Sequence, residues 1–156
     1  MKVLVVYDSV SPMKLTAKIG ETISEVLKSK GFEVDTFFVK DVEKASLKNY
    51  DCLIVGAPTM AFGVSKGMKQ FLDGLSKNDI SGKLAAAFDT QLQSMMSGNA
   101  AKGIEGKLKG LGLKPITTPL IAFVEGKLRQ NDWRLKEGQL EKAQGWAQTV
   151  AEMLPK

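Results

Sequence analysis

Short apolar runs alternate with helical patterns from one end of the chain to the other. The apolar runs predict five strands, at Lys2–Tyr7, Phe32–Val39, Asp51–Gly56, Lys83–Thr90 and Ile116–Val124. Apolar residues at helical spacing predict four helices, over Met13–Lys30, Val64–Leu75, Asn99–Leu111 and Gly138–Leu154. The polar stretch Asp41–Tyr50 has room for one more short helix, and Pro119 predicts an edge or a bend in the fifth strand.

The character of the strands predicts the fold class. Most of the runs are apolar on both faces, which is typical of parallel strands covered by helices on both sides. Strands that alternate with helices then form an α/β fold with a doubly wound, five-stranded parallel sheet. We expect one domain that spans residues 1–156, because this length suffices for a single core.

Composition and charge narrow the function classes. The net charge of +5 comes from lysines spread along the chain rather than gathered in a patch with aromatic residues, so nucleic-acid binding is not expected. The positive balance still favours an anionic ligand or partner. No apolar run is long enough to span a membrane and no leader-like segment precedes the first strand, so we expect a cytoplasmic protein. The oligomeric state stays open.

The chain has one cysteine and no histidine. Cys52 lies inside an apolar run, where we expect a buried and unreactive thiol. The composition excludes a metal site built from histidine and cysteine, and it excludes histidine-based acid–base catalysis.

A ligand site is expected where the strands end. In open parallel sheets, ligands bind beyond the carboxyl ends of the strands. Here these ends lead into the loops Asp8–Lys14, Ala57–Gly63 and Gln91–Gly98, and the fifth strand leads into the long segment Glu125–Lys136.

The first of these loops has the features of an anion site. Ser11 suits the N-cap of the following helix and Pro12 suits its first position. Free amides at that helix end, the hydroxyls of Ser9 and Thr16 and the charge of Lys14 would together attract a phosphate. The alternative, that Ser-Pro only caps a helix, stays open. Three rival sites are excluded, because the chain lacks a Rossmann glycine motif, a P-loop and an aspartate at the end of the third strand.

Several segments resemble those of flavodoxins. The flavodoxin loop pattern G-x-P-T-[WY]-x-x-G is similar to Gly56-Ala57-Pro58-Thr59-Met60-Ala61-Phe62-Gly63, and the start of the flavodoxin phosphate loop is similar to Tyr7-Asp8-Ser9-Val10. Short flavodoxin-like proteins resemble this chain at 84–90, 123–126 and 135–141. The resemblance covers essentially the whole chain in order, and it implies a flavodoxin-like sheet with strand order 2-1-3-4-5.

The resemblance implies FMN bound non-covalently at these loops. Around the phosphate it places Ser9, Val10, Ser11, Met13 and Lys14, with a further hydroxyl from Thr59. Around the flavin it places Pro58, Met60, Ala61 and Phe62, with Met60 where the family often has a stacking aromatic residue. Thr90 and Gln91 would lie near the polar edge of the flavin. Phe62 is the first aromatic candidate for the ring and Trp133 is the second, whereas Met95 and Met96 suit either ring contact or ordinary packing.

Two departures bear on this prediction. Pro12-Met13-Lys14 stands where the family has Gly-Asn-Thr, so one backbone donor to the phosphate is lost and the lysine charge offsets part of that loss. Flavodoxins that shuttle electrons also tend to be acidic, whereas this chain is basic.

The sequence therefore predicts an FMN-binding, flavodoxin-like protein that acts in electron transfer or flavin-dependent redox chemistry with a redox partner protein. Whether it is a carrier or an FMN-dependent oxidoreductase stays open. The alternative is a flavodoxin-fold protein that has lost FMN and serves as an interaction module.

Overall fold

The computed structural model describes residues 1–9, 14–60, 63–93, 98–127 and 132–155. Its centre is a mixed sheet with the strand order β2-β1-β3-β5-β7-β8. These strands are β1 (Lys2–Tyr7), β2 (Glu33–Phe38), β3 (Cys52–Met60), β5 (Leu84–Leu92), β7 (Leu120–Lys127) and β8 (Asp132–Leu135). The first five run parallel to one another, and β8 is antiparallel to β7.

The prediction of five strands is too low, although the five predicted strands do lie in the predicted order. The sheet has eight strands in the described residues, because β4 (Gly63–Val64), β6 (Lys114–Pro115) and β8 join it. Two of the added strands have only two residues, too few for a hydrophobic period to show. The predicted fifth strand, Ile116–Val124, begins too early: β6 lies just before it, and the strand itself is β7, which begins directly after Pro119. Since β7 pairs with both β5 and β8, it is not an edge strand.

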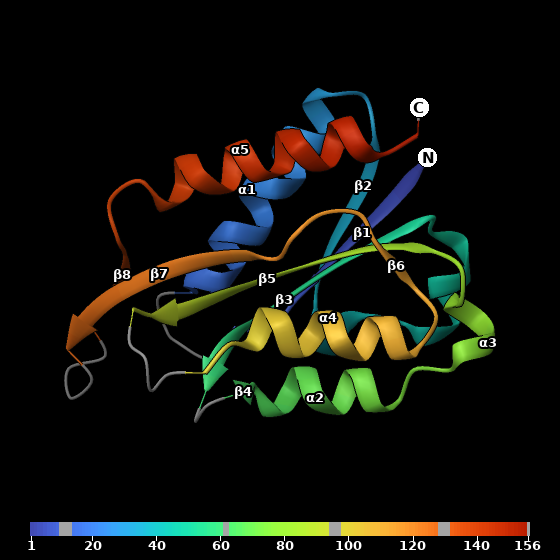
Figure 1. Ribbon diagram of the computed structural model, residues 1–156, viewed down its shortest axis with the longest axis horizontal. Helices are drawn as coiled ribbons and strands as arrows, with labels where there is room; N and C mark the ends of the chain where they lie inside the picture. The colour runs from blue at the N-terminus through green and yellow to red at the C-terminus, as the bar shows by residue number, and fades with distance from the viewer. Residues whose placement is uncertain (10–13, 61–62, 94–97, 128–131, 156) are drawn as a thin grey trace.

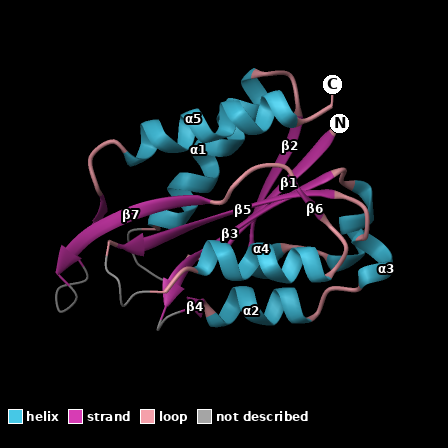
Figure 2. Cartoon of the chain, viewed as in Figure 1, coloured by secondary structure: helices cyan, strands magenta, loops and turns pink. Residues whose placement is uncertain are grey.

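The helices form two layers, one on each face of the sheet (Figure 1; cyan in Figure 2). On one face lie α1 (Leu15–Ser29) and α5 (Gln139–Met153). On the other face lie α2 (Lys66–Asp73), α3 (Lys77–Ile80) and α4 (Ala100–Gly110). The predicted polar connection holds two 3₁₀ helices, η1 (Val39–Asp41) and η2 (Lys44–Asn49).

Each face of the sheet has its own apolar core, as strands buried on both sides require. Val3 and Val5 of β1 pack toward α1 and α5, whereas Leu4 and Val6 pack toward the other layer. Phe88 fills the centre of the first core and lies so close to Gly56 that an added Cβ there would come within 2.2 Å of the phenyl ring. The glycine of the third predicted strand is thus needed for packing as well as for the loop that follows.

Cys52 is buried in β3, as predicted. Burial raises the pKa of its thiol to about 12, and the nearby charge of Asp51 acts in the same direction. The thiol is therefore protonated and unreactive at neutral pH. In the described part of the chain, every helix is too short or too polar to cross a membrane.

Candidate cofactor site

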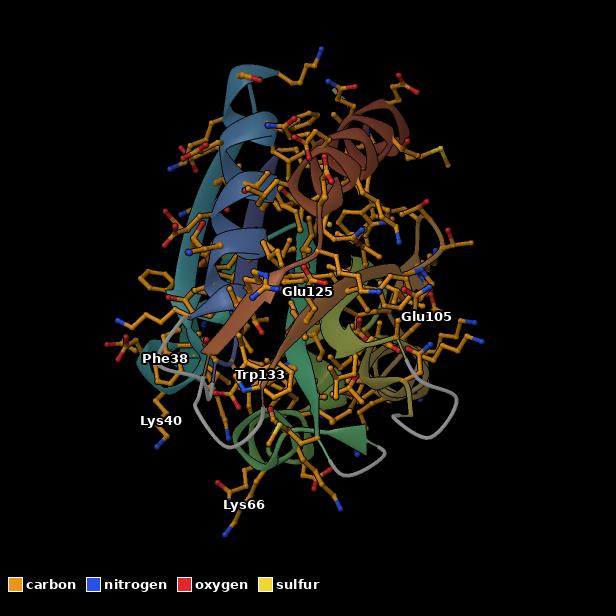
Figure 3. The ribbon with its side chains drawn as sticks, turned by 90° about the vertical axis from the view of Figure 1, so that its left-hand side faces the viewer. Phe38, Lys40, Lys66, Glu105, Glu125 and Trp133 are labelled. Atoms are coloured by element: carbon orange, nitrogen blue, oxygen red, sulfur yellow. The ribbon has the colours of Figure 1, made fainter. Side chains whose placement is uncertain are left out.

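Three strands end and three helices begin at one edge of the molecule, which we call the ligand edge. β1, β3 and β5 end here, and α1, α2 and α4 begin close to these ends. Figure 3 looks onto the edge of the molecule toward which the strands β5 and β7 point in Figure 1. The described strand and helix ends that flank the predicted site loops therefore lie at one edge, as the parallel topology requires.

The N-terminus of α1 is open. Its N-cap residue is Lys14, which has left-handed backbone angles of φ 51° and ψ 45° and makes no side-chain capping hydrogen bond. In the described part of the chain, the amides of Leu15, Thr16 and Ala17 have no hydrogen-bond partner. Lys14 itself is exposed, and no acidic residue lies in the first helical turn. The helix end therefore presents free donors and a positive charge.

Ser9 adds an unused hydroxyl close to the end of β1. Its Oγ atom is buried and has no hydrogen-bond partner among the described residues. Its amide donates to the Asp8 carboxylate at 2.9 Å, which fixes the backbone at this point. A buried hydroxyl without a partner costs free energy unless a ligand or water satisfies it. Five further predicted site residues lie outside the described ranges, namely Val10, Ser11, Met13, Ala61 and Phe62.

The N-terminus of α4 is closed by the protein itself. Its first three amides donate to three different side chains: Ala100 to Thr59 Oγ1 at 3.0 Å, Ala101 to Asp89 Oδ2 at 3.1 Å and Lys102 to Asn99 Oδ1 at 3.0 Å. Because every amide that a helix leaves free in its first turn is used, this end has no donor left for an external anion.

Asp89 is the centre of that closed end. Its side chain is fully buried, and Oδ2 also accepts hydrogen bonds from Thr59 Oγ1 at 3.1 Å and Gln91 Nε2 at 2.8 Å. Burial raises the pKa of the Asp89 carboxyl, and the hydrogen bonds from Ala101, Gln91 and Thr59 oppose that rise. The carboxylate ties the end of β5 to the end of β3 and to the start of α4.

A second buried carboxylate lies beneath the start of α2. Asp8 Oδ2 accepts a hydrogen bond of 2.6 Å from Ser65, the N-cap residue of α2. A Cβ at Gly67 would come within 2.8 Å of the same oxygen, so the missing side chain lets the helix approach the carboxylate. Asp8 therefore anchors α2 against the end of β1.

The predicted residues of the third loop are engaged inside the protein. Thr90 Oγ1 lies 2.7 Å from Thr16 Oγ1, a buried hydrogen bond between β5 and α1. Gln91 is also buried and holds Asp89. The structure thus brings Thr90, Gln91 and Thr59 together at the ligand edge, but their polar side chains bond other groups of the protein, namely Thr16, Asp89 and the Ala100 amide.

The other described site residues differ in exposure. Pro58 is half-buried beside Thr90 in the neighbouring strand, and Met60 has 46% of its surface exposed. Trp133, which the sequence did not place in any element, lies in β8 opposite Gly126 and is half-buried. In Figure 3 it is seen near the middle of the ligand edge.

Reasoning from sequence missed the structural roles of Asp8, Asp89 and Ser65. A signal was present for Asp89, because a charged residue inside an apolar strand needs a buried partner. No sequence pattern indicates that Ser65 contacts Asp8, since 57 residues separate them.

Comparison with known proteins gives a consistent result. The flavodoxin family model matches residues 5–152. A flavodoxin of Clostridium saccharobutylicum is 34% identical over 91 residues, which are 58% of this chain and 56% of that relative. The matched stretch thus spans just over half the length of the relative.

Solved structures agree on the fold. Oxidised flavodoxin 1 of Bacillus cereus superposes with a TM-score of 0.81 at 19% identity, over 99% of this chain and 100% of that one. A flavodoxin from the domain Archaea has a TM-score of 0.76 at 24% identity, over 97% of each chain. Rubredoxin oxygen:oxidoreductase of Desulfovibrio gigas has a TM-score of 0.76 at 22% identity, over 97% of this chain but only 35% of that one.

The strand order, the ligand edge and the family match over nearly the whole chain agree with one another. They support the predicted family and its cofactor, FMN. The alternative, an interaction module that has lost FMN, is not better supported. The chain belongs to the flavodoxin family.

Proposed function

We propose that this chain binds FMN non-covalently at the ligand edge and transfers electrons to or from a redox partner protein. The observation that carries the proposal is the open N-terminus of α1, with Lys14 and three amides that have no partner among the described residues; Ser9, at the end of β1, adds an unpartnered hydroxyl. When bound, FMN supplies the redox chemistry, and the protein supplies binding and electrostatics.

The donors at this end suit a phosphate group. Backbone amides at a helix N-terminus bind phosphate through directed hydrogen bonds and the helix dipole. Lys14 adds a charge-assisted contact, which offsets the donor lost at Pro12. Ser9 gains the partner that its buried hydroxyl lacks. Val10, Ser11 and Met13 belong to the same loop by sequence. Thr59 is not needed as a phosphate ligand, because its hydroxyl already holds Asp89 and α4.

The flavin ring would lie across the ends of β3 and β5. One side of the ring would be lined by Pro58, Met60, Ala61 and Phe62. Thr90 and Gln91, which the protein holds in place by hydrogen bonds, would lie at its polar edge. Trp133, which lies in β8 near the middle of the ligand edge, would contact the ring in this arrangement. Trp146 donates a hydrogen bond to Thr118, outside this group, so its replacement leaves Trp133 as a single fluorescent reporter. In Trp146→Phe we expect FMN to quench the emission of Trp133.

The experiment that tests the function compares two ligands that differ in one group. Purified protein, stripped of any bound flavin, is titrated with FMN and with riboflavin, which lacks the phosphate, while flavin fluorescence is recorded. We expect FMN to bind at least about tenfold more tightly, because the charge-assisted contacts at α1 require the phosphate. A protein that binds neither ligand would contradict the proposal. Equal affinity for FMN and riboflavin would show that the phosphate does not bind at the N-terminus of α1.

A further inference from the structure

Three helices begin at the ligand edge with lysine where helix starts normally favour acidic residues. Lys14 is the N-cap of α1, Lys66 is the first residue of α2 and Lys102 is the third residue of α4. None of these three first turns contains an acidic residue. Positive charge at a helix N-terminus is unfavourable because it opposes the helix dipole. Helix stability therefore does not explain these lysines.

Three other lysines of α1 and α4 lie at the opposite ends of these helices. Lys28 lies in the last turn of α1, and Lys107 and Lys109 lie in the last turn of α4, where the dipole favours positive charge. The last two are also paired, Lys107 with Asp73 at 3.2 Å and Lys109 with Glu105 at 3.5 Å. The basic residues of the far edge thus have a structural reason that Lys66 and Lys102 lack.

The buried carboxylates explain how the fold accommodates the reversed charges. Asp8 lies at the start of α2 and Asp89 at the start of α4, both on the inner side of these helix ends. Asp89 accepts from the Ala101 amide of α4, and Asp8 accepts from the Ser65 hydroxyl at the start of α2. Each helix start therefore has a buried acidic side chain on its inner side, so the outward positions are not required to be acidic. The outward residues at these helix starts are then free to carry the charge that suits a binding partner.

The outward lysines form one surface, which we call the basic edge and define as Lys40, Lys66 and Lys102 with Met60 between them. All three lysines are exposed, and none has a salt-bridge partner among the described residues. Lys40 and the first turn of α2 line the same shallow hollow, of about 250 Å³, and Figure 3 shows Lys40 and Lys66 pointing outward on one side of the ligand edge.

The strand pairing places Met60 inside this group. Met60 pairs with Gly63 in the β3–β4 ribbon, which leads directly into α2. The first turn of α4 packs on the same ribbon, because a Cβ at Gly103 would come within 3.2 Å of Val64. Lys66 and Lys102 therefore flank the ribbon on which Met60 stands exposed. An apolar centre with a charged rim is the usual anatomy of a transient protein interface.

Two acidic residues that Figure 3 labels, Glu105 and Glu125, lie away from Lys40 and Lys66 in that view, and they are paired with Lys109 and Arg134 respectively. Asp41, next to Lys40, is the exposed acidic residue closest to the basic edge along the chain.

We propose that the basic edge docks a redox partner with an acidic surface, so that Met60 and the flavin beside it meet the partner and the lysines steer it. This inference rests on the proposed function in one respect, because a redox partner approaches this edge only if the flavin is bound there. The pattern of exposed lysines does not depend on FMN. Steering by complementary charge raises the rate of encounter and weakens as salt screens it.

The test measures binding of two small redox proteins of opposite charge, an acidic plant-type ferredoxin and basic cytochrome c. The variant is Lys66→Glu/Lys102→Glu, and the control is Lys48→Glu/Lys114→Glu. The control lysines are exposed at the opposite edge, and both variants lower the net charge by the same amount. Association is measured by calorimetry at low and moderate salt, and FMN binding is titrated for every variant.

We expect the wild type to bind ferredoxin and not cytochrome c, with an affinity that falls as salt rises. The first variant should lose about tenfold in affinity for ferredoxin, whereas the control should change less than twofold. Equal losses in both variants would overturn the proposal, because only net charge would then matter. Preference for cytochrome c, or no binding of ferredoxin, would overturn it too.

Two further probes separate other polyanions from a protein partner. Tighter binding to duplex DNA or to vesicles with phosphatidylserine than to ferredoxin, with the same dependence on Lys66 and Lys102, would assign the surface to another class and contradict the proposal. Failure of the proposed function is visible separately, since a chain that does not bind FMN still allows the ferredoxin measurement on the flavin-free protein.

Discussion

Helices α1 and α4 begin at the same edge of the sheet and face the same physical problem, but they meet it in opposite ways. Both must provide for amides that the helix itself leaves free. In α4 the side chains of Thr59, Asp89 and Asn99 accept all of them. In α1 no described side chain does so, and the N-cap is a lysine in a left-handed conformation.

The difference shows that a helix N-terminus becomes a binding site only if the fold leaves it uncapped. Helix α4 has the same kind of dipole as α1 and the same first-turn amides. In α4, however, the buried Asp89 carboxylate accepts from one of these amides, where a bound anion would otherwise do so. We therefore expect a phosphate at the open end of α1 and not at the closed end of α4.

The largest expected effect is on the closed end. Asp89→Ala removes an acceptor that serves Thr59, Gln91 and the Ala101 amide, which leaves buried donors without partners. We expect the free energy of unfolding to fall by about 3 kcal/mol or more, as measured by urea denaturation of the flavin-free protein. Asp79→Ala, on the exposed surface of α3, serves as the control and should change stability by less than about 0.5 kcal/mol. Similar losses in both variants would contradict the role of Asp89.

At the open end the main effect is on ligand binding. Lys14→Ala removes the charge and keeps the backbone strain, so FMN should bind at least about tenfold more weakly, which corresponds to about 1.5 kcal/mol. Riboflavin affinity should not change, because it has no phosphate. Lys18→Ala, one turn further along α1, is the matched control and should alter FMN affinity less than about twofold. Small, equal effects of the two variants would show that the phosphate binds elsewhere.

A smaller effect of opposite sign tests whether the left-handed N-cap is strained. Glycine tolerates positive φ, so Lys14→Gly removes the strain of the left-handed conformation. Glycine also makes the unfolded chain more flexible, which opposes this gain, and we expect a net rise of about 0.5–1 kcal/mol in the free energy of unfolding of the flavin-free protein. The same change at Lys18, inside the helix, should lower stability by about 1 kcal/mol. The comparison is made by chemical denaturation, and destabilisation by both changes would argue against strain at Lys14.

The smallest expected effect is a dependence on pH. Burial raises the pKa of Asp89 in the folded protein above its value of 3.8 in the unfolded chain. The folded state therefore holds this proton more tightly, so the stability linked to it is fully present below pH 3.8 and is lost as the pH rises through the folded pKa. Relative to Asp89→Asn, which does not titrate, the wild type should lose stability across that window, as measured by denaturation at a series of pH values. A difference that stays constant with pH would contradict the raised pKa.

Most of the fold could be predicted because its signals are local. Most of the parallel strands are apolar on both faces, and apolar residues recur at helical spacing in the helices, so each element was recognisable within its own segment. β4, β6 and β8 were not, since two of them are very short and β8 depends on pairing with β7. Trp133 could not be assigned to an element from the sequence, because it lies in β8.

The site was predicted in part. The edge of the sheet at which the loops lie follows from the topology. Ser9, after β1, has an unpartnered hydroxyl and Lys14 is the N-cap of α1, whereas their contact with a phosphate stays a prediction. The hydroxyl and amide groups of Thr59, Thr90 and Gln91 were expected to face the cofactor, but they hold Asp89, Thr16 and α4. Such choices between ligand and protein partners are made by contacts over long sequence separations, which no local pattern contains.

The sequence alone predicted the family, the parallel sheet and the edge at which we expect a ligand, because hydrophobic period and loop motifs are properties of short segments. Only the tertiary structure decided which helix end is open and which is closed. That decision depends on whether a buried carboxylate from another strand reaches the free amides, as Asp89 does for α4, and on whether a residue such as Lys14 leaves them exposed.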